Sequence, residues 1–461
     1  TSANDGTGST LREAFDICND NFTELYGGTT SALGFKSEGT NFTGSLLIGH
    51  STTGTISNAQ YNVGVGINAL DNLTTGDQNV AIGYAAGGLL QDGSNNIVIG
   101  FGAGDALTSG GNNVAIGSLA LSTEDGHGRN VAVGYQSLFA QNAGADAYNV
   151  AVGYQAGTVI STGTQNTIIG GLAGDALTTG SNNIAIGYNA LSSADTDARN
   201  VAIGTRALED QDAGNNTYNV AIGYEAGKQV TTGIQNTILG ASSGDALTSG
   251  QFNVAMGYGA LGSATDTDQS VAIGHGALAA LNYSGDSNNT AVGHNAGGSV
   301  VYGIKNTLLG AFAGDALTDG QKNVAVGYNA LTTEDGHGRN VAVGHEALKN
   351  QDAGADAYNV AVGYDAGLSI TTGIQNTIIG GKAGDALNTG SDNVAIGYFT
   401  MSADDAGGRN VAVGSKALKN QNGGDANVYN VGVGYNAGAS MTSGTLNTII
   451  GGNAGDALTT G

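Results

Sequence analysis

The sequence predicts an all-β fold: a parallel β-solenoid, or β-roll, whose short coils stack on one another with a period of 17 to 19 along the chain. A pentapeptide resembling Asn-Val-Ala-Ile-Gly recurs 24 times from Ser45 onward, and most steps between copies are 17 residues. From Asn130 every fourth step lengthens to 19, or to 20 at the last, so four coils form a super-repeat of 70. Proline is absent from the whole chain. A short fixed period is typical of stacked repeats, and coils that donate backbone hydrogen bonds to their neighbours exclude proline.

One coil, residues 183–199, shows how the pattern folds. Ile184 and Ile186 share one face of a short strand, and Ala185 lies on the other face. Gly187 permits a corner, and a polar loop closes the coil. The coil is too short for a strand–helix–strand unit. We expect the Ala and Gly positions of the pentapeptide to leave one face narrow enough for close approach by other chains.

Residues 1–28 differ from the rest and predict a short helix. Thr10 and Glu13 fit a capping box, apolar residues follow at heptad spacing from Leu11 to Leu25, and Gly27-Gly28 supplies a stop. We interpret this helix as an attachment or trimerisation segment, although a cap on the first coil is the alternative. The expected domains are therefore the helical segment 1–28, a transition 29–44 and a shaft of 24 coils, 45–461.

Composition narrows the function. The net charge is −24, which disfavours nucleic acid and anionic membranes as partners. A single cysteine, Cys18, excludes an intrachain disulfide. No apolar run is long enough for a membrane-spanning helix, so we expect no membrane insertion. Because Gly461 falls shortly before the next pentapeptide would be due, we expect the gene product to continue beyond it.

Each coil contains few large apolar side chains, and their burial falls short of the conformational entropy lost on ordering the coil. We therefore expect coils from several chains to pack together in an elongated homotrimer, three being the preferred count. The first pentapeptide residue is Asn in 22 of the 24 coils. Stacked Asn amides predict a hydrogen-bonded ladder from coil to coil; the alternative is a turn residue in a left-handed conformation.

No residue is predicted to be catalytic, cofactor-binding or metal-binding, and no cofactor is expected. His127 and His337 lie in identical segments and are expected to be exposed, the alternative being a metal shared by symmetry-related chains. Aspartates in two sets of loops are interpreted as turn-stabilising rather than calcium-binding. The first set is Asp195, Asp197, Asp266 and Asp268; the second follows the Gly-Asp-Ala-Leu motif at Asp105, Asp175, Asp245, Asp315, Asp385 and Asp456.

Catalysis is not expected. Glycine pairs such as Gly64-Val65-Gly66 do not form the strand–loop–helix unit of a phosphate site. A glycosidase needs two carboxylates in one cleft, whereas the repeat places its acids equivalently in every super-repeat. Threonines sit mainly in loops, which argues against a flat ice-binding array. Tyrosines follow the pentapeptide glycine regularly and are interpreted as architectural: Tyr84, Tyr135, Tyr154, Tyr188, Tyr224 and Tyr258.

The pentapeptide beginning at Ser270, Ser-Val-Ala-Ile-Gly followed by Ala277, resembles the head repeat of trimeric autotransporter adhesins. That resemblance covers the coils 45–461. It implies a left-handed parallel β-roll, assembled as a trimer on a bacterial surface, that binds host or matrix.

The N-terminal segments 11–15 (Leu-Arg-Glu-Ala-Phe) and 19–26 (Asn-Asp-Asn-Phe-Thr-Glu-Leu-Tyr) are similar to the start of tail-fibre and related structural proteins of marine bacteriophages. Arrays of Asn-Val-Ala-Ile-Gly-Tyr are also typical of such fibres. This resemblance implies a virion-attached fibre whose N-terminal end docks on the baseplate or another virion protein, while its distal end meets a host receptor. The sequence thus predicts the shaft of a phage tail fibre, with a bacterial adhesin head as the alternative.

Overall fold

The chain folds as an all-β parallel β-solenoid in this computed structural model, which describes residues 35–39, 42–49, 56–424 and 427–460. Within those ranges no helix occurs. The helix expected in residues 1–28 lies outside the described residues. The fold divides into two compact units, residues 1–206 with 214–216, and residues 207–213 with 217–461.

The first unit begins with an antiparallel pair. Strand β1 (Phe35–Gly39) pairs with β2 (Phe42–Ile48), so regular structure starts inside the segment predicted as a transition. Strand β2 then pairs in parallel with β3 (Val63–Val65), and each later strand pairs in parallel with the one before it. These later strands are β4 (Val80–Ile82), β5 (Ile97–Ile99), β6 (Val114–Ile116), β7 (Val131–Val133), β8 (Val150–Val152), β9 (Thr167–Ile169), β10 (Ile184–Ile186) and β11 (Val201–Ile203).

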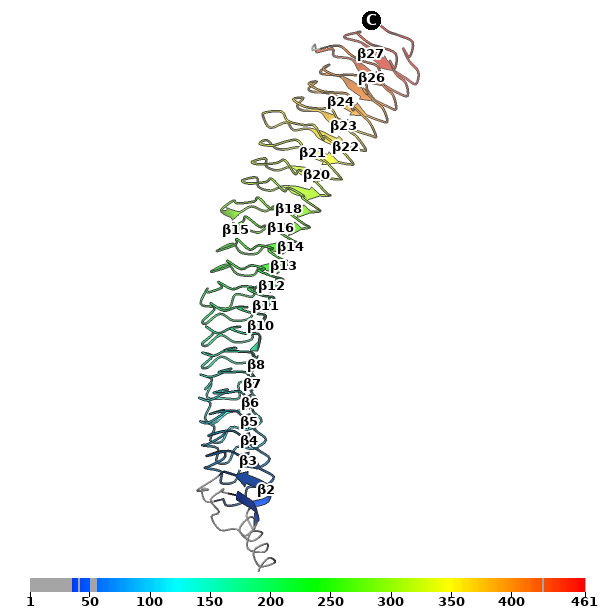
Figure 1. Ribbon diagram of the computed structural model, residues 1–461. Helices are drawn as coiled ribbons and strands as arrows, with labels where there is room; N and C mark the ends of the chain where they lie inside the picture. The colour runs from blue at the N-terminus through cyan, green and yellow to red at the C-terminus, as the bar shows by residue number, and fades with distance from the viewer. Residues whose placement is uncertain (1–34, 40–41, 50–55, 425–426, 461) are drawn as a thin grey trace, which may run out of the picture. The chain divides into compact units, whose positions relative to one another are not determined.

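The second unit repeats the same arrangement, with its strands following one another up the stack (Figure 1). Its main strands are β12 (Val220–Ile222), β13 (Thr237–Leu239), β14 (Val254–Met256), β16 (Val271–Ile273), β18 (Thr290–Val292), β19 (Thr307–Leu309), β20 (Val324–Val326), β21 (Val341–Val343), β22 (Val360–Val362), β23 (Thr377–Ile379), β24 (Val394–Ile396), β25 (Val411–Val413), β26 (Val431–Val433) and β27 (Thr448–Ile450). A small separate sheet pairs β15 (Thr267–Asp268) with β17 (Gly285–Asp286) on the loop side.

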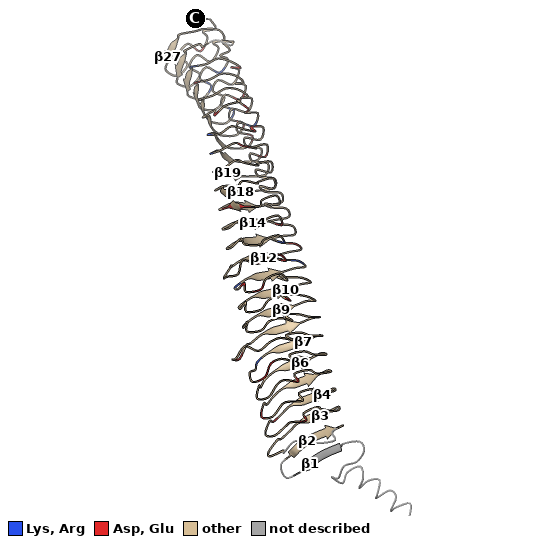
Figure 2. Ribbon diagram, turned by 90° about the vertical axis from the view of Figure 1, so that its left-hand side faces the viewer, with Lys and Arg blue, Asp and Glu red and all other residues tan. Residues whose placement is uncertain are grey.

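Pairing follows the repeat without slippage. Ile184 of β10 pairs with Thr167 of β9 on one side and with Val201 of β11 on the other, each at the same place in its pentapeptide. Equivalent positions of successive pentapeptides therefore lie directly above one another in columns. A residue type that recurs at one position of the pentapeptide forms a continuous column along the sheet. In Figure 2 the three-residue strands of the sheet are tan, because charged residues fall in the loops and not in these strands.

The two faces of each strand are assigned opposite to our expectation. Ala185 is fully buried inside its own coil, whereas Ile184 on the other face is 37% exposed. The prediction that the Ala and Gly positions face other chains is therefore wrong. The coil interior is narrow and already holds Leu191, which is also fully buried. At the equivalent strand position in β3, a Cβ on Gly64 would lie 2.5 Å from a terminal methyl carbon of Leu47, so a side chain there would displace Leu47.

The pentapeptide glycine makes the corner that the sequence predicts. Gly187 has a φ of +140°, a conformation that L-residues rarely adopt. A Cβ at this position would also lie 2.4 Å from the carbonyl oxygen of Gly204 in the next coil. Both the bend and the close stacking of successive corners therefore require glycine.

The pentapeptide asparagines form the expected ladder from coil to coil. The side-chain oxygen of Asn79 accepts a hydrogen bond from the backbone N–H of Asn96 at 3.0 Å and from its amide nitrogen at 3.1 Å. The Asn96 amide also donates to the carbonyl of Gly110 at 2.9 Å, which closes its own coil. Among the described residues no pentapeptide asparagine has a positive φ, so the left-handed alternative does not hold. The left-handed residue is the preceding one, such as Asn95.

Candidate functional site

The outer face of the sheet, formed by the second and fourth residues of the pentapeptides, is an extended apolar surface without a partner among the described residues. These residues are Val, Ile and Leu in most coils, with Thr in some, and their side chains point away from the coil interior. Several are more than one third exposed: Ile82, Ile97, Ile169 and Ile184 in the first unit, and Ile222, Leu309 and Ile379 in the second. Contiguous exposed apolar surface of this kind marks an interaction site.

Aromatic residues line the corner next to the outer face. In the second unit one continuous series of rings has neighbouring centroids 5.0–6.2 Å apart, stacked except for the two edge-to-face contacts of Phe312: Tyr258, His275, His294, Phe312, Tyr328, His345 and Tyr364. In the first unit Tyr84 stacks on Phe101, and Tyr135 stacks on Tyr154. The tyrosines interpreted as architectural are also substantially exposed, as Tyr258 is at 61%.

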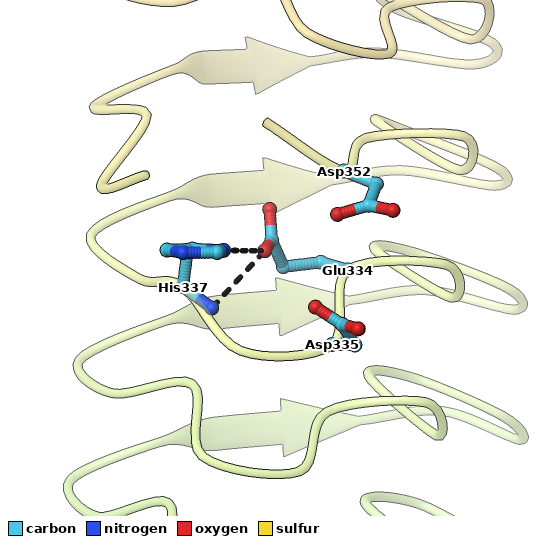
Figure 3. A group of neighbouring side chains, drawn as sticks. All are labelled: Glu334, Asp335, His337 and Asp352. Carbon is cyan, nitrogen blue, oxygen red and sulfur yellow. Dashed lines mark hydrogen bonds and ion pairs between the residues drawn. The ribbon is translucent and has the colours of Figure 1, made fainter. Parts of the chain in front are cut away.

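A second kind of site lies in the loops. Glu334, Asp335, His337 and Asp352 form a group whose potential ligand atoms all lie within 4.8 Å of one another. We call this group the Glu334 cluster. Figure 3 shows the Glu334 carboxyl between the His337 ring on one side and the two aspartates on the other. The first three residues come from the loop before β21, and Asp352 comes from the loop after it.

Glu334 is the unusual member of the Glu334 cluster because its side chain is fully buried. The backbone N–H of His337 donates to its Oε1 at 3.1 Å, and the imidazole Nδ1 lies 3.5 Å from the same oxygen. No hydrogen-bond donor of the described chain reaches the buried Oε2. Burial raises the pKa of Glu334 to about 7, and the negative charges of Asp352 and Asp335 act in the same direction. His337 is half-buried rather than exposed, since 32% of its side chain is accessible.

The first unit contains an equivalent group three super-repeats earlier, at Glu124, Asp125 and His127. Glu124 is fully buried, its Oε2 has no partner, and burial raises its pKa. His127 Nδ1 lies 3.5 Å from Glu124 Oε1, as in the second unit. Asn142 occupies the position of Asp352, so this Glu124 cluster has one carboxylate fewer.

The other predicted aspartates are part of the coils themselves. Asp266 accepts hydrogen bonds from Ser249 at 2.6 Å and Thr248 at 2.9 Å, which lower its pKa. Asp268 accepts from the backbone of Gln251 at 2.7 Å. These contacts join neighbouring coils, so both aspartates hold their loops to the coil before them.

Asp197 is buried and Asp195 exposed, both within the same loop. Half-burial raises the pKa of most aspartates in the Gly-Asp-Ala-Leu motif, while backbone N–H groups of the motif lower it. This holds for Asp105, Asp175, Asp245, Asp315 and Asp385.

Sequence reasoning missed Glu124 and Glu334. It singled out the histidines of the repeated segment and interpreted them as exposed. The signal that points to the glutamates is a comparison of super-repeats, because Ala194 and Ala264 occupy the same position as Glu334 in other coils. Alanine at this position in two super-repeats indicates that the position faces the interior of the coil. Glutamate at the same position in two other super-repeats therefore indicates a buried carboxyl group.

A polar cavity of about 150 Å³ lies beside the Glu334 cluster, lined by Asp319, Gly336 and Arg339 among others. Ligand pockets usually enclose roughly 300–1,000 Å³, so this cavity is small. A search of the described residues found no helix with the length and apolar character needed to span a membrane. The chain matches no protein-family model, no curated protein and no solved structure.

Proposed function

We propose that the chain is the shaft of a bacteriophage tail fibre, a virion appendage that presents a host-recognition tip. Three copies pack side by side as a homotrimer. The N-terminal end attaches to the baseplate or another virion protein, and the distal end meets a receptor on the host cell. The role is mechanical and not enzymatic, with neither nucleic acid nor membrane insertion involved.

The exposed outer face is the single observation that carries this proposal. In each unit the apolar side chains of the outer face stack in columns at the spacing of the strands, about 4.8 Å. Ile169 of β9 and Ile184 of β10 are both 37% exposed. Covering such a face stabilises a protein by about 25 cal/mol for each Å² removed from water. A second and third copy of the same chain supply matching faces at the same spacing.

Two further features support a structural role over catalysis. The strands and corners repeat with the same geometry in every coil, so they form no singular cleft among the described residues. The cavity beside Arg339, at about 150 Å³, is too small to bind a polysaccharide segment. The similarity of segments 11–15 and 19–26 to marine phage fibre proteins favours a virion over other locations.

The mass of the full chain in solution tests the proposal. One chain has a mass of 45.4 kDa, so light scattering should give three times that value. A well-folded species at the mass of one chain would contradict the homotrimer. Electron microscopy of the same sample should show fibres.

A pair of double variants locates the interface. Ile169→Lys with Ile184→Lys places two charges on the outer face and should shift the mass towards a single chain. Thr179→Lys with Ser193→Lys adds the same charge to exposed loops of the same two coils and should leave the trimer intact. Equal effects of the two pairs would show that charge, and not the outer face, controls assembly.

A bacterial trimeric adhesin head is the second candidate, supported by the exposed aromatic series from Tyr258 to Tyr364 on its flank. Such a head binds host or matrix through its sides. Antibody labelling distinguishes the two functions: the fibre is found on purified virions, and the adhesin on the bacterial surface.

A further inference from the structure

We propose that the Glu334 cluster binds a divalent transition-metal cation, and we take Zn²⁺ as the representative of this class. The site lies within the second unit and uses side chains of one chain only. It is therefore independent of the proposed trimer and of the proposed fibre.

The spacing of the ligand atoms fits a metal ion. Zn²⁺ binds carboxylate oxygen and imidazole nitrogen at about 2.0–2.2 Å in tetrahedral geometry, so two of its ligand atoms lie roughly 3.4 Å apart. The atoms of the Glu334 cluster already lie within 4.8 Å of one another. His337 Nδ1 and Glu334 Oε1 already have this spacing, at 3.5 Å, and the most distant pair must approach by about 1.4 Å at most, which side-chain rotation supplies. Asp335 and Asp352 are exposed and free to make that rotation.

Two buried atoms point independently to a ligand. Oε2 of Glu334 is closed to water and has no hydrogen-bond partner, and Nδ1 of His337 is closed to water and has only Glu334 Oε1 beside it, at 3.5 Å and without a hydrogen bond. A buried polar atom without a partner costs free energy, and an anionic oxygen costs more. A metal ion can accept an electron pair from both atoms at once. No hydrogen-bond donor of the described chain contacts either atom. The same two atoms are unpartnered in the Glu124 cluster, so the feature occurs twice.

The fold itself does not need this carboxylate. Ala264 occupies the equivalent position one super-repeat earlier and is fully buried, as is Ala194 in the first unit. The coil therefore closes without any polar side chain at this place. Retaining three carboxylates within 4.8 Å of one another, without a cation, sets like charges against each other.

The imidazole decides the class of metal. Ca²⁺ and Mg²⁺ take oxygen ligands, whereas imidazole nitrogen suits Zn²⁺ and its transition-metal neighbours. One imidazole and three carboxylates thus favour a borderline transition cation over an alkaline-earth ion. The Glu124 cluster offers one imidazole and two carboxylates, and should bind the same ion more weakly.

Titration of the metal-free full chain with ZnCl₂, followed by calorimetry, tests the site. We expect saturable binding with a tighter and a weaker class. Glu334→Ala should abolish the tighter class, and the coil should remain folded because Ala264 fills the same place. Asp352→Asn, at an exposed position, should weaken the tighter class by about tenfold or more, since even indirect partners of a metal contribute 10–100-fold. Asp92→Asn removes an exposed carboxylate elsewhere and should change nothing.

Hydrogen exchange locates the bound ion. Zn²⁺ should slow amide exchange in residues 331–356 of the unaltered chain, and this protection should disappear in Glu334→Ala. The absence of saturable Zn²⁺ binding would overturn the proposal, as would unchanged binding in Glu334→Ala. Binding of Ca²⁺ as tight as that of Zn²⁺ would overturn the assignment of the metal class.

Discussion

The coils that contain Glu334 and Ala264 have the same strand, corner and buried loop position, but they place different residues at that loop position. Both residues are fully buried, and they lie one super-repeat apart in equivalent loops. One coil encloses an unpartnered carboxylate, and the other encloses only a methyl group. The comparison shows that the stacked backbone fixes the fold, so that chemistry at this position is free to vary between coils.

Asp404 is the intermediate case, at the same position in the next super-repeat. The backbone N–H of Gly407 donates to its Oδ1 at 2.9 Å, and the Asn410 amide lies 3.4 Å from Oδ2. Both oxygens thus have partners from the coil. Glutamate is one methylene longer, and in the Glu334 coil one oxygen extends beyond such partners. The length of the side chain therefore decides whether the carboxylate is hydrogen-bonded within the coil, as in Asp404, or has an oxygen available to a ligand, as in Glu334.

The largest effect is expected when the Ala264 coil receives the charge. Ala264→Glu places a carboxylate in a fully buried position that has no imidazole, because Thr267 stands where His337 does. An unpaired buried charge costs several kcal/mol, and we expect a loss of about 3–5 kcal/mol at pH 8. Thermal unfolding and amide exchange across residues 261–270 measure the loss.

Ala264→Gln is the control for volume. It has the size of glutamate without the charge, and should cost less than Ala264→Glu at pH 8. The two variants should converge at pH 4, where glutamate is neutral. Equal losses at both pH values would show that overpacking alone separates the Ala264 coil from the Glu334 coil.

The repeat made much of this fold predictable. The features that it did not predict depend on packing in three dimensions, which a sequence pattern does not contain. A period of 17 fixes the register, and the requirement for glycine at Gly187 follows from the corner it makes. Alternation of Ile184 and Ala185 shows that the strand has two faces, but it does not say which face is inside. The space inside the coil decides that, and the loop side already places the fully buried Leu191 there. Glu334 was missed for a related reason: its burial comes from the loop path and not from a local pattern.

Removing the carboxyl of Asp404 should have a smaller effect that changes sign with pH. Burial raises the pKa of Asp404 to about 6 from an ordinary 3.8, and the charge of Asp405 adds to the shift, although the Gly407 N–H opposes it. The folded state therefore holds this proton more tightly than the unfolded state. Stability contributed by Asp404 is present below pH 4, falls as the pH rises to about 6, and stays low above it. Asp404→Ala should stabilise the coil at pH 8 by about 1 kcal/mol, since two pKa units correspond to about 3 kcal/mol and the two lost hydrogen bonds offset about 1 kcal/mol each.

At pH 4 the same substitution should be neutral or slightly destabilising, because the neutral acid keeps its hydrogen bonds. Melting temperatures of Asp404→Ala and the unaltered chain, measured from pH 4 to pH 8, give the difference curve. Asp405→Asn is the control: it removes a neighbouring charge and should retain most of the pH dependence, since burial is the main cause. A difference that does not vary with pH would contradict the assignment to Asp404.

The last predicted effect concerns affinity and makes the Glu124 cluster like the Glu334 cluster. Asn142→Asp supplies the carboxylate that Asp352 provides in the second unit, and Asn142 is equivalent to it in backbone pairing, since its N–H donates to the carbonyl of Ser161. In a Glu334→Ala background, where the Glu124 cluster remains, we expect Asn142→Asp to tighten Zn²⁺ binding about tenfold, or by about 1.4 kcal/mol. Calorimetry measures the change directly.

Asn422→Asp provides the matched control in the same Glu334→Ala background. It adds a carboxylate at the equivalent position of the Asp404 coil, where Gly407 stands in place of the histidine. If the imidazole and the buried glutamate define the site, Asn422→Asp leaves Zn²⁺ affinity unchanged although it adds the same charge. If both substitutions tighten binding equally, Zn²⁺ responds to the acidity of the loops and the Glu124 and Glu334 coils have no special place among the repeats. The distinction depends on two side chains, an imidazole and a buried carboxylate, set into a backbone that every coil shares.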